Sequence, residues 1–140
     1  MQHMALFTSD ILQTLKSMRE VSDIGGFEFM EAPKGNYYSN LRSRLDVNPA
    51  SSPLVVNLSD EQYMKIEELG ILADRDDQGL LLQIFTKPIG DRPTLFLEII
   101  QRIGCSANGF QKPGCGGFGK GNFKDLFKSI EEYEKTLAID

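Results

Sequence analysis

The chain has 140 residues, of which 41% are hydrophobic and 25% charged, and these fractions are typical of one globular domain rather than a disordered or fibrous chain. Fifteen basic against 20 acidic residues give a net charge of -5, which argues against a nucleic acid partner. No apolar run reaches the roughly 18 residues of a membrane span, and no secretory leader follows Met1, so we expect a soluble, intracellular protein that does not bind membranes. Cys105 and Cys115 lack a CxxC spacing, and we expect reduced thiols.

Helical periodicity and capping residues predict the elements of the first half of the chain. In chain order these are a strand over residues 3–8, a helix from 11 to about 20, a short helix over 37–45, a surface loop over 46–57 and a helix over 60–69. Ser9 or Asp10 can cap the first helix. Ser59 and Gln62 match a capping box, in which each side chain bonds to the backbone of the other, and Gly70 ends the helix that they open.

Beyond Gly70 the hydrophobic period changes to two, which predicts strands over 71–75, 80–87 and 94–102. The connections between them are short, so neighbouring strands should be antiparallel. A loop over 106–113 and a glycine-rich stretch then lead to a closing helix over 122–137. The apolar residues spaced for one face of this amphipathic helix are Phe123, Leu126, Phe127, Ile130 and Tyr133.

The glycine-rich stretch over 114–121 satisfies both GxGxxG and GxxxxGK, but we reject both phosphate-binding interpretations. Gly121 stands where a P-loop needs Ser or Thr, and the preceding segment is predicted as a loop where both motifs need a strand. We interpret the stretch as a flexible loop that holds Phe118 as a lid over a pocket.

Glu98 is unusual because it lies in a strand that is apolar on both faces. An uncompensated buried charge costs several kcal/mol, so its carboxylate needs a cation, a metal ion or hydrogen-bond donors. An ion pair with Arg92 or Arg102 and an edge strand open on one face are the structural alternatives to a ligand role. Gln83 is a similarly isolated polar residue on the preceding strand, and the two together predict a shared polar pocket.

His3 is the only histidine in the sequence. A histidine between apolar neighbours on a strand is either a hydrogen-bonded core residue or a ligand. Together with Glu98 it supplies two thirds of the 2-His-1-carboxylate triad of non-haem Fe(II) oxygenases, and the third ligand is missing from the sequence.

Several long segments together resemble the 4-hydroxyphenylpyruvate dioxygenase family of the plant type. They are Gln2–Leu6, Arg75–Gly79, Leu82–Pro88, Gly90–Thr94, Glu98–Arg102 and Gly116–Phe123. The resemblance extends over nearly the whole chain and is weakest over 48–57 and 106–112.

The resemblance implies an α+β fold of the vicinal-oxygen-chelate type, like glyoxalase and dihydroxybiphenyl dioxygenase, in which βαβββ modules pair into an open barrel around iron. Residues 1–140 would form one C-terminal catalytic module with a mostly antiparallel half-barrel sheet, flanking helices and a C-terminal helix, the first module being absent. It implies Fe(II) as the cofactor, bound by His3 and Glu98, with the other iron histidine upstream in the family chain. The residues implied to line the substrate pocket are Gln2, Gln83, Phe85, Phe96, Phe118, Asn122 and Phe123, and those implied to be catalytic are Gln83, Phe85 and Asn122.

The resemblance also implies a reaction, in which 4-hydroxyphenylpyruvate and O2 give homogentisate and CO2. This reaction belongs to tyrosine and phenylalanine catabolism and supplies a precursor of plastoquinone and tocopherol, and full-length members are expected to be homodimers. We expect a cytoplasmic protein, or a plastid one if a transit peptide lies upstream. The 140-residue chain alone, as a fragment with one iron histidine missing, should be inactive.

Two alternatives remain open. One is a 4-hydroxymandelate synthase, which hydroxylates the side chain of the same oxo acid. The other is a non-catalytic module that binds a small aromatic acid or pairs with a full-length relative.

Overall fold

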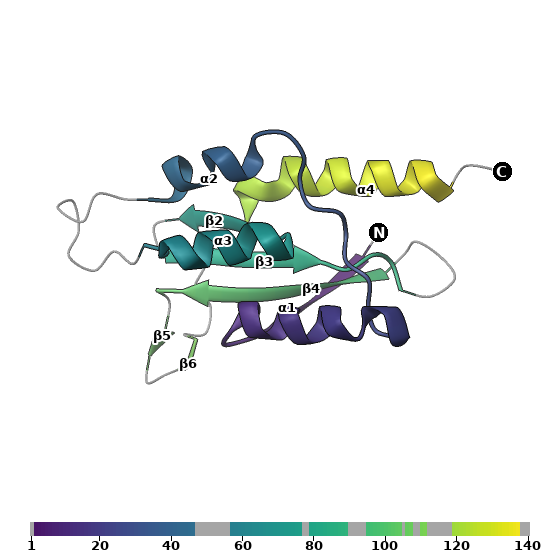
Figure 1. Ribbon diagram of the computed structural model, residues 1–140, viewed down its shortest axis with the longest axis horizontal. Helices are drawn as coiled ribbons and strands as arrows, with labels where there is room; N and C mark the ends of the chain where they lie inside the picture. Colours follow the sequence, from purple (N-terminus) through teal and green to yellow (C-terminus); the bar gives the residue numbers. More distant parts are fainter. Residues whose placement is uncertain are drawn as a thin grey trace.

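A four-stranded sheet lies at the centre of the computed structural model, which describes residues 2–46, 57–76, 79–89, 95–104, 106–107, 110–111 and 119–137 (Figure 1). Its elements, in chain order, are β1 (Gln2–Phe7), α1 (Ile11–Glu20), the 3₁₀ helix η1 (Ser22–Ile24), α2 (Tyr37–Leu45), α3 (Asp60–Leu69), β2 (Leu72–Asp76), β3 (Gly79–Phe85), β4 (Leu95–Ile103), β5 (Ser106–Ala107), β6 (Phe110–Gln111), the 3₁₀ helix η3 (Lys120–Asn122) and α4 (Phe123–Leu137). Among the described residues, no helix has the length and apolar character needed to cross a membrane.

The helix ends follow from local chemistry, as the sequence predicts. The Asp10 side chain accepts a hydrogen bond from the backbone of Gln13 and caps α1. Ser59 and Gln62 form the predicted capping box at the start of α3, with bonds of 3.2 and 2.8 Å that satisfy two N–H groups without a partner inside the helix. Gly70 ends α3 with a φ of 74°, a left-handed conformation that glycine adopts without strain.

The strand order is β1-β4-β3-β2, so β1 and β2 form the edges of the sheet. β1 runs parallel to β4, and the other neighbouring pairs are antiparallel. The register sets His3 beside Phe96 and Phe85 beside Glu98. Because directly paired residues project to the same face of a sheet, one face carries the imidazole, both rings and the carboxylate.

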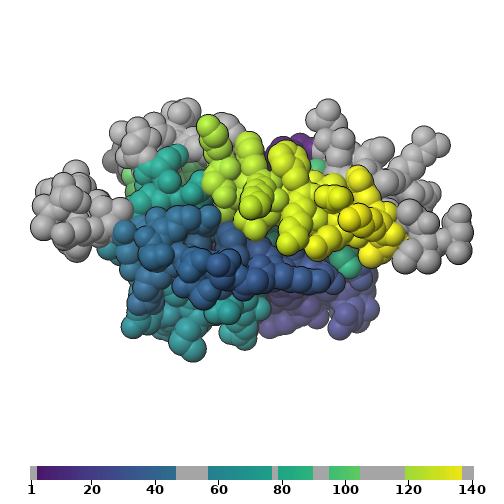
Figure 2. Space-filling view, turned by 90° about the horizontal axis from the view of Figure 1, so that it is seen from above, coloured from purple at the N-terminus to yellow at the C-terminus, as the bar shows by residue number. Residues whose placement is uncertain are grey.

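The helices cover the two faces of the sheet unequally. The larger hydrophobic cluster joins one face to α1, α2 and α3 through residues such as Leu15, Leu41 and Ile66, which are almost fully buried. A smaller cluster joins the opposite face to α4, where Leu126 packs near Phe85 and Phe96. α4 runs alongside α2 and the segment that leads into it (Figures 1 and 2). The face that carries His3 and Glu98 is therefore the face on which α4 packs.

Two expectations from the sequence are wrong. The segment predicted as a loop over 106–113 contains the short hairpin of β5 and β6, whose strands are too short for a hydrophobic period to reveal. Phe127 does not share the buried face of α4, because its side chain is 63% exposed while Leu126 is buried. One position along a helix turns the side chain by about 100°, which carries Phe127 out of the contact with the sheet. Cys105 and Cys115 lie outside the described residues.

A candidate metal and substrate site

His3 lies on the edge strand β1, and its side chain is exposed. Its imidazole stacks on the ring of Phe96, with ring centroids 5.2 Å apart, and meets the edge of Phe85 at 6.4 Å. Because the side chain is exposed, the interpretation of His3 as a buried core histidine is wrong.

Glu98 lies in the middle of β4 and is only 4% exposed. β4 lies between β1, which carries His3, and β3, which carries Phe85. Burial raises the pKa of its carboxyl from 4.5 to about 7, and the charge of Arg102 partly opposes this rise. No ion pair of Glu98 is found in the described part of the chain, so the ion pair with Arg102, one of the structural alternatives to a ligand role, is not formed. Arg92 lies outside the described residues. A buried carboxylate with this environment is suited to a divalent cation.

The register brings the two expected metal ligands to adjacent strands on the same face. Glu98 is paired with Ala5, which is two residues beyond His3 on β1. An imidazole nitrogen and a carboxylate oxygen are suitable donors for non-haem Fe(II). Across the described residues there is no group of three or more histidine, cysteine and acidic side chains that could hold a metal ion. The described residues therefore offer two candidate ligands, and a complete triad would need a third from outside them.

Gln83 and Asn122 are polar side chains that are completely buried on the α4 side of the sheet. Neither nitrogen nor oxygen of the Gln83 amide has a hydrogen-bond partner among the described residues, and the same holds for Nδ2 of Asn122. Buried polar groups of folded proteins are almost always paired, because an unpaired one costs about 1–3 kcal/mol. These three atoms therefore have hydrogen-bonding capacity that no described residue uses. Gln83 and Glu98 lie on the same face of neighbouring strands, and the pocket that the sequence predicts from them stays a prediction.

A tight turn brings Asn122 to the sheet. Gly119 has a φ of 78°, and the backbone N–H of Asn122 donates to its carbonyl at 2.8 Å. A Cβ at Gly119 would overlap the Gln83 side chain, so only glycine allows the turn to lie this close to β3. The carboxylate of Asp74 on β2 accepts a bond of 2.9 Å from the backbone N–H of Gly121, which ties the turn to the sheet.

The remaining expected pocket residues lie at different places. Phe85 and Phe96 are buried and form an edge-to-face pair 5.8 Å apart, which gives the site an aromatic wall beside His3. Phe123 is half-buried at the start of α4, and the centroid of its ring lies 6.0 Å from that of Phe127. Gln2 pairs with Leu95 at the start of β1. Phe118 lies outside the described residues.

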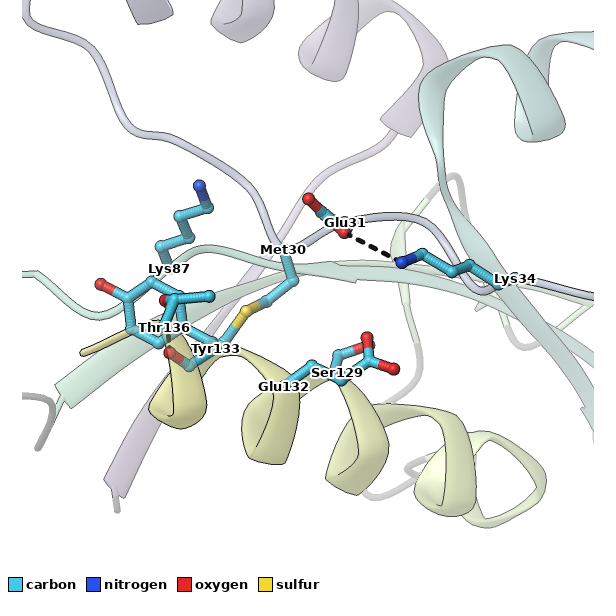
Figure 3. Close-up of a pocket in the computed structure, with 8 residues that line it drawn as sticks. All are labelled: Met30, Glu31, Lys34, Lys87, Ser129, Glu132, Tyr133 and Thr136. Carbon is cyan, nitrogen blue, oxygen red and sulfur yellow. Dashed lines mark hydrogen bonds and ion pairs between the residues drawn. The ribbon is translucent and has the colours of Figure 1, made fainter. Parts of the chain in front are cut away.

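A separate groove of about 370 Å³ opens between α4 and the segment of residues 30–34 (Figure 3). It is lined by charges of both signs, and Lys34 and Glu31 form an ion pair of 3.8 Å along the wall opposite α4. None of the residues expected to bind substrate or metal lines this groove.

Two residues of the site have no signal in the sequence. Tyr37 and Arg44 of α2 converge on the oxygen of the Asn122 amide, although they lie 85 and 78 positions away along the chain. The sequence identifies Tyr37 only as a helix start, because hydrogen bonds between distant segments leave no local pattern.

The chain resembles known proteins both in sequence and in fold. No protein-family model matches the chain. The chain is 62% identical to 4-hydroxyphenylpyruvate dioxygenase of Plectranthus scutellarioides and 61% to that of Daucus carota, in each case over 97% of this chain and 30% of the relative. The 4-hydroxyphenylpyruvate dioxygenase of Danio rerio is 47% identical over 94% of the chain and 28% of its own length.

Two solved structures resemble the fold. A 4-hydroxymandelate synthase mutant from Streptomyces coelicolor matches with a TM-score of 0.61 and 32% identity over 95% of this chain and 30% of its own. A fusion protein of a xylose isomerase-like TIM barrel and 4-hydroxyphenylpyruvate dioxygenase matches with a TM-score of 0.64 and 26% identity, covering 94% of this chain and 17% of that one.

The four-stranded sheet, its helices and these neighbours define an α+β module of the vicinal-oxygen-chelate type. Within that class, the chain is homologous to part of the 4-hydroxyphenylpyruvate dioxygenases, and the plant enzymes of this name resemble it more than the animal one. The chain spans about 30% of the length of these relatives.

Proposed function

We propose that the chain is the C-terminal catalytic module of a 4-hydroxyphenylpyruvate dioxygenase, which converts 4-hydroxyphenylpyruvate and O2 to homogentisate and CO2. The observation that carries the proposal is the buried Glu98 carboxylate, which has no ion pair in the described part of the chain and shares a sheet face with His3. The identity of 62% to an enzyme of this name supports it.

His3 and Glu98 would hold Fe(II) together with one histidine from outside the 140 residues. When bound, the metal ion supplies the redox chemistry that activates O2 and a Lewis acid for the oxo acid group. Holding a carboxylate in a buried site disfavours its charge in the absence of the metal, as the pKa of about 7 shows. A divalent cation would compensate that charge.

The other site residues would bind and orient the aromatic oxo acid. Phe85 and Phe96 offer ring faces and edges close to His3, which suits a phenyl ring. Gln83 and Asn122 offer buried amide groups for a polar group of the ligand that lies away from the metal. The packing of α4 on this face buries Phe85 and Phe96, and this dry aromatic wall would protect the oxidising step from side reactions.

The homodimer, and a location in the cytoplasm or in plastids, belong to the same proposal and rest on the resemblance alone. A 4-hydroxymandelate synthase remains a second candidate, because a protein of that name shares the fold at 32% identity. The much higher identity to the dioxygenases favours homogentisate as the product.

The test is a chimera in which the 140 residues replace the matching segment of the Plectranthus scutellarioides relative. The chimera should bind iron and release homogentisate, and chromatographic analysis would distinguish it from 4-hydroxymandelate. Glu98→Gln should lower iron content and turnover at least tenfold, since an anionic ligand is lost while the side chain keeps its size. Glu68→Gln, which changes an exposed carboxyl on α3, is the matched control. Normal iron content in Glu98→Gln would contradict the proposal.

A further inference from the structure

The two ends of the Asn122 amide have different surroundings. Its Oδ1 accepts a hydrogen bond of 2.7 Å from the hydroxyl of Tyr37 and lies 3.5 Å from Nη2 of Arg44. Its Nδ2 is buried and has no partner among the residues that the structure describes. In this orientation, Asn122 can donate a hydrogen bond to a ligand and cannot accept one with its satisfied oxygen.

Tyr37 by itself does not determine this orientation. Its hydroxyl accepts a bond of 2.9 Å from the backbone N–H of Ala73, and its own proton can go to Asn122 at 2.7 Å or to the carbonyl of Ala73 at 3.2 Å. If the amide were turned over, Nδ2 would donate to the Tyr37 oxygen and Tyr37 would donate to Ala73. Both arrangements satisfy the hydroxyl.

Arg44 makes the two orientations unequal. Its guanidinium has donors only, and Nη2 lies 2.8 Å from the carbonyl of Ala73, 3.3 Å from the Tyr37 hydroxyl and 3.5 Å from Asn122 Oδ1. The guanidinium also lies over the Tyr37 ring, at 5.1 Å from its centroid, which holds it in place. Turning the amide over would place N–H groups against a positive charge that cannot accept a hydrogen bond.

We propose that Arg44 is a positioning residue that fixes Asn122 as a hydrogen-bond donor, so that the site prefers a ligand with an oxygen acceptor at this point. The ligand atom follows from the sheet order. Asn122 is anchored at β2, while the metal ligands lie on β1 and β4, and strands about 4.8 Å apart place β4 and β2 about 10 Å from each other. On the proposed function, the oxo acid end lies at the metal and the acceptor near Asn122 is the ring hydroxyl.

The experiment uses the chimera and two ligands that differ only in that hydroxyl, 4-hydroxyphenylpyruvate and phenylpyruvate. Arg44→Met keeps the apolar stem and removes every donor. It should raise the dissociation constant and KM for 4-hydroxyphenylpyruvate about tenfold and leave those for phenylpyruvate within twofold. Arg44→Lys, which keeps a donor-only cation, should restore most of the preference for 4-hydroxyphenylpyruvate over phenylpyruvate. Arg42→Met, which removes an exposed arginine paired with Asp60, should change neither constant.

If Arg44 had a purely structural role, Arg44→Met would weaken the binding of both ligands equally, and that result would overturn the proposal. Unchanged binding of both ligands would overturn it as well. If Arg44→Met does not yield folded protein, Arg44→Gln provides the test, because glutamine keeps a donor for Ala73 but can also accept. Arg44→Gln should raise the dissociation constant for 4-hydroxyphenylpyruvate, relative to that for phenylpyruvate, at least fivefold. An unchanged ratio of the two constants would also overturn the proposal. The proposed function is tested separately by the product of the unmutated chimera. A chimera that makes no homogentisate but binds the hydroxylated ligand more tightly, with the preference lost in Arg44→Met, would refute only the function.

Discussion

Replacing Glu98 by glutamine should stabilise the metal-free chain at alkaline pH, even though it removes a proposed metal ligand. The carboxyl is 4% exposed and its pKa is about 7, compared with an ordinary value of 4.5. Folding therefore favours the neutral form, and ionising the group in the folded state costs free energy. Glutamine has nearly the same size and carries no charge, so the variant avoids that cost.

The magnitude follows from the two pKa values. Below about pH 4.5 the carboxyl is protonated in the folded and unfolded chains, and it has no effect on stability. As the pH rises from 4.5 to 7, the unfolded chain loses this proton while the folded chain keeps it, so stability falls; above pH 7 the loss is complete. At about 1.4 kcal/mol for each pKa unit, the full loss is about 3 kcal/mol. Glu98→Gln should therefore be more stable than the parent by about 3 kcal/mol at pH 8 and by less than about 1 kcal/mol at pH 5.

Urea unfolding in the presence of a chelator, at pH 5 and pH 8, measures this difference. Glu68→Gln, with its exposed carboxyl, should match the parent at both pH values. A stabilising ion pair of Glu98 predicts the opposite sign, because its removal would destabilise the chain at pH 8. Either a less stable variant at pH 8 or a gain that does not depend on pH would refute the reasoning.

Three further predictions concern the site. The purified 140-residue chain should bind Fe(II) weakly and show no turnover, because two protein ligands leave the metal largely hydrated; homogentisate formed at the rate of the full-length relatives would contradict this. Gly119→Ala in the chimera should cost more stability, and more activity, than Gly35→Ala. Both glycines have nearly the same φ, 78° and 77°, but only a Cβ at Gly119 overlaps Gln83, and equal thermal unfolding and KM in the two variants would exclude that contact. Phe118→Ala should leave the melting temperature within a few degrees and raise KM for 4-hydroxyphenylpyruvate, while a large drop in melting temperature with unchanged KM would make Phe118 a core residue.

Local chemistry made much of the fold predictable from the sequence. The capping box of Ser59 and Gln62 and the end of α3 at Gly70 depend on neighbouring residues only, and the structure confirms both. The burial of Glu98 was predictable because its neighbours on both sides of the strand are apolar. The exposure of His3 was not, because it depends on which strand lies at the edge of the sheet, and strand order is a property of the tertiary fold.

The arrangement around Asn122 shows the same limit more clearly. Its hydrogen bonds join residues 78 and 85 positions apart, and neither Tyr37 nor Arg44 has a periodicity or a motif that points to the contact. The resemblance identified Asn122 as a pocket residue, but only the structure shows which end of its amide is free. The hairpin of β5 and β6 was missed for a related reason, because a strand of two residues has no measurable period.

A comparison of two glutamines on neighbouring strands supports the proposal that the site lies on the α4 face. Gln101 lies on β4 and faces the larger core, where its Oε1 accepts from the backbone of Ile11 at 2.9 Å and its Nε2 donates to the carbonyl of Ser9 at 2.8 Å. Gln83 lies on β3, faces α4, is fully buried and has neither end paired among the described residues. A buried amide that serves only to stabilise a fold finds partners, as Gln101 does. On the opposite face, Gln83, Glu98 and Nδ2 of Asn122 all retain bonding capacity at a cost in stability, and this cost is expected where a bound ligand completes the contacts.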